Sequence, residues 1–206
     1  MNTPPNPTTP ETTSTAAIAR ALLADGWTND PDYRAEPAQG GESRHMKSPD
    51  GTLSLLAHDV SDGRCFAMLT AAKVRAGGKR RRSWQARLDA APASVALAVI
   101  SAARQADTSS DTDSIEPLLA AAGWHEQPED LDEDLDDEFD DYDDEDGPVI
   151  RTWAAPDGAR SVTWYGPDND PAFWGVARSR AEGGAISALL TQHTPAQVIA
   201  AVALAD

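Results

Sequence analysis

Apolar positions with helical spacing alternate along the chain with apolar positions spaced two residues apart. Ile18 and Leu22 lie four residues apart shortly before Gly26-Trp27, and a similar apolar pattern precedes Gly123-Trp124. Helical spacing followed by glycine predicts an amphipathic helix that ends in a left-handed residue, with the tryptophan packed back onto the last turn. We therefore expect two short helices, one ending before each glycine.

Several other segments have the pattern of strands. The tripeptide Pro-Asp-Gly occurs at 49–51 and at 156–158, and alternating apolar residues follow each copy. This pattern predicts a tight turn between two strands. Thr194-Pro195 predicts the start of the last helix, with threonine as N-cap and proline in the first turn. Further strands are expected at 66–69, 83–88, 174–177 and about 185–190.

Three sequence anchors occur twice in the same order. The segment 22–27 recurs at 119–124, the turn 48–51 recurs at 155–158, and 91–95 recurs at 194–198, at offsets of 97, 107 and 103 residues. Such an ordered recurrence is typical of an internal duplication.

The duplication predicts an α+β fold of two tandem repeats, each ordered as helix, three- or four-stranded antiparallel sheet and helix. Because small domains bury little surface on their own, we expect the repeats to pack together with pseudo-two-fold symmetry. The expected boundaries are a disordered N-terminal tail at 1–14, repeat 1 at 15–106, a linker at 107–113 and repeat 2 at 114–206, with a disordered acidic insertion at about 126–146.

The net charge of −17 resides in that insertion. Fifteen of the 34 acidic residues lie between Glu126 and Asp146, so the rest of the chain is close to neutral. Mutual repulsion and the lack of apolar periodicity predict disorder. Aspartates at 132, 134 and 136 alternate as in a calcium loop, but the missing glycine at the sixth position excludes an EF-hand. Apolar residues spaced along the segment suggest docking on a basic protein partner, or mimicry of a nucleic acid: Leu131, Leu135, Phe139 and Tyr142.

A basic cluster lies at an expected strand-to-strand turn of the first repeat. The segment 73–82 holds six Lys or Arg and no carboxylate. Six cations on one loop are able to contact phosphates, although a solvated turn at a sheet edge is the simpler interpretation. The cluster and the acidic segment attract each other, so we expect contact within one molecule or self-association between two. The candidate nucleic-acid-binding residues are Lys73, Arg75, Lys79, Arg80, Arg81 and Arg82.

The sequence offers no constellation for catalysis. The four histidines have no counterpart in the other repeat: no histidine lies at the position that matches His45, His58, His125 or His193. None of them belongs to a nucleophile motif, and their spacing is not that of metal ligands. Cys65 opens an apolar run, which favours a half-buried packing role over a nucleophile. We therefore expect a protein that is not an enzyme and has no cofactor or metal site. The tryptophans are expected to pack in the core.

The same features predict a cytoplasmic location. A single cysteine allows no intrachain disulfide, and the first 14 residues lack the basic and apolar regions of a signal peptide. No run approaches the ~18 apolar residues that span a bilayer, so no membrane partner is expected.

The repeat resembles the SPDY domain, a short module of unknown function that occurs, often in pairs, in streptomycetes and related actinobacteria. The second copy lacks the family's serine, and both copies have glycine where the family has tyrosine. The resemblance implies an actinobacterial origin and an association with mobile elements, and it brings no catalytic residue. It is carried by Gly26-Trp27, Gly123-Trp124, Ser48-Pro49-Asp50 and Thr194-Pro195, and it covers about 15–106 and 114–205.

Two functions stay open from the sequence. The first is a non-enzymatic interaction module that binds a partner protein, with the acidic loop of repeat 2 as a contact. The second is a nucleic-acid-binding accessory protein of an actinobacterial mobile element, which uses the basic loop 73–82 and is gated by the acidic loop. The near-neutral body of the chain favours the first.

Overall fold

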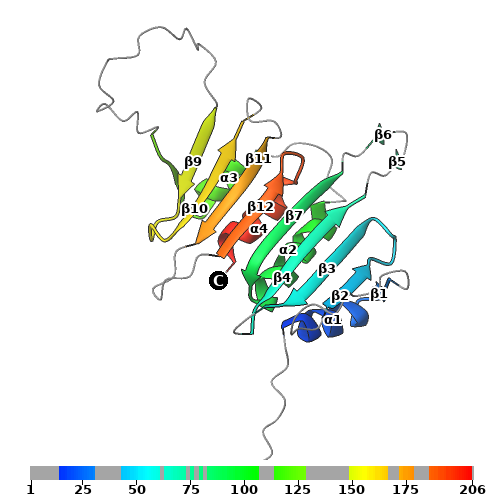
Figure 1. Ribbon diagram of the computed structural model, residues 1–206. Helices are drawn as coiled ribbons and strands as arrows, with labels where there is room; N and C mark the ends of the chain where they lie inside the picture. Colours follow the sequence, from blue (N-terminus) through cyan, green and yellow to red (C-terminus); the bar gives the residue numbers. More distant parts are fainter. Residues whose placement is uncertain are drawn as a thin grey trace, which may run out of the picture.

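The fold is α+β and contains one large antiparallel sheet (Figure 1). The structure is a computed structural model, and the residues that it describes contain four α-helices. The described residues are 14–30, 43–60, 63–72, 75–76, 79–80, 83–106, 114–128, 149–166, 172–178 and 186–205.

Each half of the chain contributes two helices and a group of strands. The first half contains α1 (Ser14–Ala24), β1 (Thr28–Asn29), β2 (Ser43–Lys47), β3 (Leu53–Asp59), β4 (Cys65–Ala71), β7 (Trp84–Ala91) and α2 (Ala93–Ala106). The second half contains α3 (Ile115–Ala121), β8 (His125–Glu126), β9 (Ile150–Ala154), β10 (Arg160–Tyr165), β11 (Phe173–Arg178), β12 (Ile186–Thr191) and α4 (Ala196–Leu204). A small hairpin, β5 (Arg75–Ala76) and β6 (Lys79–Arg80), connects β4 to β7.

The two halves meet in the middle of one ten-stranded sheet. Its strand order is β1-β2-β3-β4-β7-β12-β11-β10-β9-β8, and every neighbouring pair is antiparallel. The central pair is β7 with β12, in which Arg87 lies opposite Leu189, between an Ala86–Leu190 pair and a Leu88–Ala188 pair. Strands about a hundred residues apart in sequence therefore hold the sheet together.

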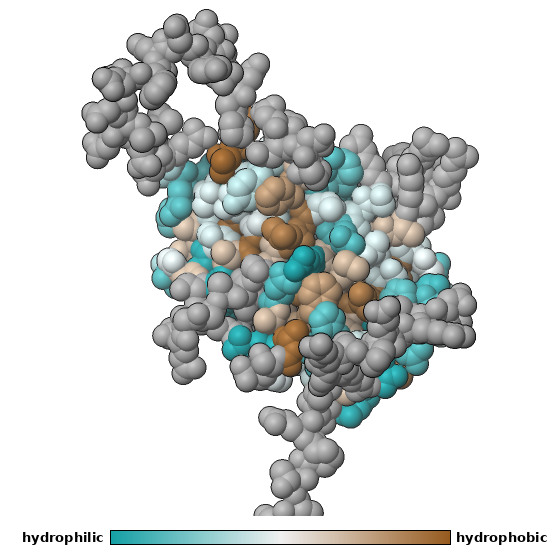
Figure 2. Space-filling model, viewed as in Figure 1, coloured by the Kyte–Doolittle hydropathy of each residue, from teal (hydrophilic) through white to brown (hydrophobic). Residues whose placement is uncertain are grey.

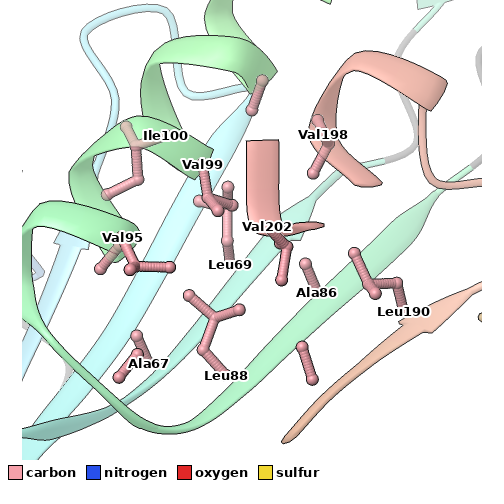
Figure 3. Close-up of a cluster of buried hydrophobic side chains, with 14 of the residues drawn as sticks. Ala67, Leu69, Ala86, Leu88, Val95, Val99, Ile100, Leu190, Val198 and Val202 are labelled. Atoms are coloured by element: carbon pink, nitrogen blue, oxygen red, sulfur yellow. The ribbon is translucent and has the colours of Figure 1, made fainter. Parts of the chain in front are cut away.

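The helices cover one face of the sheet, and the core lies beneath them (Figure 1). Val95 and Val99 of α2, and Val198 and Val202 of α4, have the four-residue spacing that places both side chains on one helix face. In Figure 3 these side chains point toward residues of β4, β7 and β12, among them Leu190. Because α2 and α4 also contact each other, the buried residues of both halves form one continuous cluster.

Both predicted helix ends are confirmed. Gly26 has φ +83° and Gly123 has φ +79°, in the left-handed region that glycine enters without a Cβ clash. The N–H of Trp27 donates to the Leu22 carbonyl at 3.0 Å, and the N–H of Trp124 donates to the carbonyl of Leu119 at 3.0 Å. These are the bonds of a Schellman motif, and the tryptophan that follows each glycine is buried.

The Pro-Asp-Gly turns are also confirmed, and each one packs against a helix end. The N–H groups of Gly51 and Gly158 donate to the carbonyls of Ser48 and Ala155, at 2.9 Å in both turns. A Cβ on Gly26 would lie 3.4 Å from Cγ of Pro49, and one on Gly123 would lie 3.2 Å from Cγ of Pro156. The helix-end glycine and the turn proline are thus in contact in each half, which explains why the two anchors recur together.

The aspartates of these turns serve the turns themselves. Asp50 accepts hydrogen bonds from the Ser48 hydroxyl at 2.6 Å and from the N–H of Thr52 at 3.1 Å. The Ser48 bond is the main reason why the pKa of Asp50 is lowered. Asp157 accepts from the N–H of Ala159 at 3.0 Å, which likewise lowers its pKa. The recurrence of aspartate therefore has a structural cause.

Three expectations differ in detail from the structure. Ser14, assigned above to the tail, is the first residue of α1, and Glu126, assigned to the insertion, belongs to β8. The last helix begins at Ala196 with Pro195 as N-cap and without a side-chain cap. The Thr194 hydroxyl donates instead to the Gln85 carbonyl of β7, at 3.4 Å, because that strand is close enough to compete for it.

The remaining parts of the predicted tail, linker and acidic insertion, at 1–13, 107–113 and 129–148, lie outside the described residues.

The expected core role of the tryptophans is confirmed. Four of them are buried, and Trp164 and Trp174 pack partly buried against the core. The rings of Trp153, Trp164 and Trp174 also contact one another beneath the second half of the sheet, at centroid distances of 4.6 and 6.1 Å. Among the described helices, none has the length and apolar character required to cross a membrane.

We expect Gly123→Ala to lower the free energy of unfolding by about 2 kcal/mol, because it adds left-handed strain to a tight contact. The new Cβ would lie 3.2 Å from Pro156 Cγ. The matched control is Gly51→Ala, at φ +70° with no atom within 4 Å of the new Cβ, for which strain alone predicts about 1 kcal/mol. Urea denaturation measures both values. Equal losses would show that the contact with Pro156 contributes nothing.

Candidate binding surface

The face of the sheet opposite the helices is covered by none of the described elements (Figure 2). Burial alternates along β3 and β4, where every second residue is buried beneath the helices and the residues between are half-buried. We call the side that carries these intermediate positions the open face. Figure 2 shows apolar side chains gathered in the middle of this face, with hydrophilic ones around and among them.

The strand register defines one row of side chains across the open face. Directly paired residues on neighbouring strands point to the same side of a sheet. Leu189 in this row is 45% exposed, and Ile150, on the same face of β9, is 38% exposed. From β2 to β10 the row consists of His45, Leu56, Met68, Arg87, Leu189, Gly175 and Thr163.

Two aromatic pairs stand on the open face, one in each half. The His58 and Phe66 rings, on β3 and β4, are 4.7 Å apart between centroids at an interplanar angle of 21°. The Tyr165 and Phe173 rings, on β10 and β11, are 4.4 Å apart at 19°. Two rings lying side by side in one plane cannot approach this closely, so each ring covers a face of its neighbour.

A cation lies at the centre of the same face. The Arg87 guanidinium is 5.4 Å from the Phe66 ring centroid, and its Nε donates to Asp89 Oδ1 at 3.0 Å. The Arg87 side chain is 51% exposed and that of Asp89 is 32% exposed. The arrangement places an accessible charge between the apolar side chains Met68 and Leu189, its direct neighbours across the strands.

The edge of the first half carries a second charged group. Asp30, whose side chain is only 7% exposed, lies 2.9 Å from His45 Nδ1 and 3.0 Å from Lys47 Nζ. These contacts fasten the residue after β1 to the neighbouring strand β2. We assign the group a structural role because the carboxylate is surrounded by its own partners.

Arg151 joins three elements at the opposite edge. Its Nη1 lies 2.6 Å from Glu116 of α3, its Nε and Nη2 lie 2.7 and 2.9 Å from the Glu126 carboxylate of β8, and its guanidinium lies 4.9 Å from the Trp153 ring centroid. Hydrogen bonds from Ser114 and then Arg151 lower the pKa of Glu116, and Arg151 lowers the pKa of Glu126. The same bonds raise the pKa of Arg151. Arg151 therefore fixes both strands that flank residues 129–148.

Cys65 and His58 lie on the paired strands β4 and β3 but on opposite faces of the sheet. Cys65 is fully buried rather than half-buried, and burial raises the pKa of its thiol to about 11, so the thiolate that a nucleophile requires is scarce at neutral pH. His58 is stacked on Phe66, and His125 lies exposed in the two-residue strand β8. Within the described part of the chain, no three His, Cys, Asp or Glu side chains come close enough to hold a metal ion.

The predicted basic cluster is described only in part. Arg75, Lys79 and Arg80 lie in the β5–β6 hairpin, with Arg75 opposite Arg80, as expected for a strand-to-strand turn. The other basic candidates, Lys73, Arg81 and Arg82, lie outside the described residues. So do all the predicted contacts of the acidic segment, namely Leu131, Leu135, Phe139 and Tyr142.

The sequence reasoning missed the open face, although two signals pointed to it. The run 65–69 is apolar at every position, which indicates a strand with apolar side chains on both faces. The offset of 107 residues also relates His58 to Tyr165 and Phe66 to Phe173, two aromatic pairs that alternate with core positions. Recognising the surface further required knowing which face the helices cover.

The chain matches no family model, no curated protein and no solved structure. The resemblance to the SPDY domain therefore stays a prediction.

We expect Arg151→Gln to destabilise the protein at neutral pH, and the loss to shrink in acid. Because the pKa values of Glu116 and Glu126 are lowered in the folded state, their ionised forms stabilise the fold above the ordinary value of 4.5. This contribution disappears as the pH falls through the lowered folded values.

Urea denaturation of wild type and variant at pH values from about 3 to about 7 measures the difference. Arg20→Gln, at an exposed position of α1, controls for the loss of one positive charge. A difference between wild type and Arg151→Gln that does not change with pH would contradict the prediction.

Proposed function

We propose that this protein is a non-enzymatic interaction module that binds a partner protein through its open face. One observation carries the proposal: a sheet face that none of the described elements covers gathers the exposed Leu189 and several half-buried apolar and aromatic side chains around one arginine. Surfaces that bind proteins combine aromatic and aliphatic side chains with arginine in this way. The residues concerned are Leu56, Phe66, Met68, Arg87, Tyr165, Phe173 and Leu189.

The orientation of the rings favours a protein over a nucleic acid. Single-stranded nucleic acids are held by bases stacked on accessible ring faces. Here the His58 and Phe66 rings cover each other, and Arg87 lies over the Phe66 ring. Tyr165 and Phe173 cover each other in the same manner. Because ring faces are covered in this way, the surface offers mainly ring edges and aliphatic side chains. Such groups pack against another protein surface better than they stack on nucleic-acid bases.

The alternative is a nucleic-acid-binding accessory protein of a mobile element. The observation in its favour is the β5–β6 hairpin, which pairs Arg75 with Arg80 within a segment of six cations and no carboxylate. Such a loop is able to bind phosphates. Binding through the hairpin alone would leave the open face without a role, so we rank this function second.

Two further predictions accompany the main proposal. The acidic segment at about 126–146 stays a predicted second contact, which would engage a basic surface of a protein partner. We also propose a cytoplasmic location on the basis of the lone cysteine, which is buried and unable to pair within the chain.

We further propose that the chain is a tandem repeat with pseudo-two-fold symmetry. In support, the Ala86–Leu190 and Leu88–Ala188 pairs are interchanged by a rotation about the point between Arg87 and Leu189. The same rotation relates the aromatic pair of one half to that of the other, and it likewise relates the two contacts between glycine and proline. In the pairing of β7 with β12, each strand thus presents the same surface to the other, as two copies of a single unit would do.

If the halves are equivalent, Leu88→Ala and Leu190→Ala should destabilise the protein equally. Leu88 is 2% exposed and Leu190 is 1% exposed. Loss of a buried leucine costs about 2–5 kcal/mol, and we expect the two values to agree within about 1 kcal/mol. Chemical denaturation provides both numbers. A much larger difference would argue against equivalent environments at the centre of the sheet.

The binding function is tested by site-specific photo-crosslinking in cells. A photoreactive amino acid is placed at Leu189 on the open face and, as a matched control, at Leu23 on α1, which is 49% exposed. We expect a discrete protein adduct from position 189 that resists nuclease and is missing from position 23. Equal crosslinking at both positions would remove the open face as the site, and an adduct destroyed by nuclease would support the alternative function.

A further inference from the structure

We infer that the open face takes an acidic, apolar segment of its partner, laid across the central strands with a carboxylate on Arg87. The inference rests on the proposed function and specifies the chemistry of the partner. It is carried by the position of Arg87 between two apolar side chains of the open face and by the charge of the hairpin at the end of the same strand.

The first step concerns the charge at the centre. Arg87 is the guanidinium in the central row, and Asp89 accepts a hydrogen bond from its Nε–H, one of five N–H groups on the side chain. With 51% of its side chain exposed, Arg87 is accessible to a second carboxylate from outside. Carboxylates bind arginine through two parallel hydrogen bonds, which gives such a contact both strength and direction.

The second step concerns the end of the central strands. The β5–β6 hairpin connects β4 to β7, the strand that carries Arg87 (Figure 1). The segment 73–82, to which the hairpin belongs, contains six cations and no carboxylate. A partner that lies over β4 and β7 therefore has a positively charged segment at one end of these strands, and acidic residues on that side of the partner would be attracted.

The third step concerns the apolar contacts on both sides of Arg87. Met68 and Leu189 are its direct neighbours across the strands, and Leu189 is the most exposed apolar side chain of the central row. Beyond them lie the His58–Phe66 pair in one half and the Tyr165–Phe173 pair in the other. A segment that carries apolar residues between its carboxylates fits this sequence of contacts.

A second copy of the chain fits the same face less well. Laid face to face about the same centre, two copies would bring both Arg87 side chains into the middle of one interface. Like charges brought together and removed from water are unfavourable at the centre of an interface. An acidic partner removes that cost, and for this reason we choose it over a homodimer.

The test uses a fluorescent peptide with the sequence of residues 126–146, because it combines carboxylates with Leu131, Leu135, Phe139 and Tyr142. Fluorescence anisotropy measures its binding to the full chain and to a variant in which 129–148 is a Gly-Ser stretch of equal length. The variant removes competition from the chain's own acidic residues. The comparison probes are the same peptide with serine at the four apolar positions and a single-stranded DNA of similar length.

We expect the peptide to bind at least one of the two proteins, and to bind more weakly as NaCl rises from about 50 to about 300 mM. Arg87→Gln and Leu189→Ser should each raise the dissociation constant by about tenfold or more. Leu23→Ser, a change of the same type on α1, should leave it unchanged. Far-UV circular dichroism and thermal melting confirm that the variants fold.

Several outcomes would overturn the inference. These are the absence of peptide binding by both proteins, binding unchanged in Arg87→Gln and Leu189→Ser, or equal binding of the serine-substituted peptide. Preferential binding of the DNA, if lost in Arg87→Gln, would assign the open face to nucleic acid. If the peptide fails while the crosslink at Leu189 still captures a protein, the proposed function stands and only the acidic chemistry of the partner is wrong.

Discussion

The antiparallel pairing of β7 with β12 joins the two halves of this protein into a single body. Among the described residues, each half has two helices and brings five strands to the large sheet, which is little material for an independent core. Once the central strands pair, α2 and α4 lie side by side and their valines share one apolar layer with Leu88 and Leu190. The pairing also removes two sheet edges that would otherwise have unpaired backbone groups.

The same pairing creates the surface that we propose to be functional. With all described helices on one side, the join of the halves produces a wide sheet whose other side is covered by none of the described elements. Arg87 and Leu189 face each other across the join, so the centre of the open face is made by both halves and exists only in the assembled sheet. The aromatic pairs lie farther out, one in each half, and frame this centre.

Local order in each half depends on a contact between a helix end and a turn. Gly26 allows α1 to end and leaves room for Pro49, and Gly123 does the same for α3 and Pro156. The second half adds a device of its own, in which Arg151 binds Glu116 and Glu126 and so fastens α3 and β8 to β9. In the sequence the acidic segment lies between β8 and β9, and these ion pairs hold the two flanking strands together.

The amino-acid sequence by itself determined the short-range features. The helix ends at Gly26 and Gly123 and the turns at 49–51 and 156–158 followed from a few neighbouring residues, because backbone conformation at glycine and proline is restricted locally. The four main strands of each half followed from short apolar or alternating runs, and the burial of the tryptophans followed from their places in these runs and after the helix-end glycines. The prediction of a half-buried Cys65, by contrast, is wrong, because a short apolar run does not reveal what covers it.

Only the tertiary structure decided how the halves meet and which face is left open. The register of β7 against β12 joins residues about a hundred positions apart, and no local pattern encodes such a pairing. The Thr194 hydroxyl shows the same effect on a small scale, since its contact with the Gln85 carbonyl replaces the helix cap that its local sequence favours. The binding surface followed from these long-range contacts, because a side chain such as Leu189 belongs to the core or to the surface according to which face the helices cover.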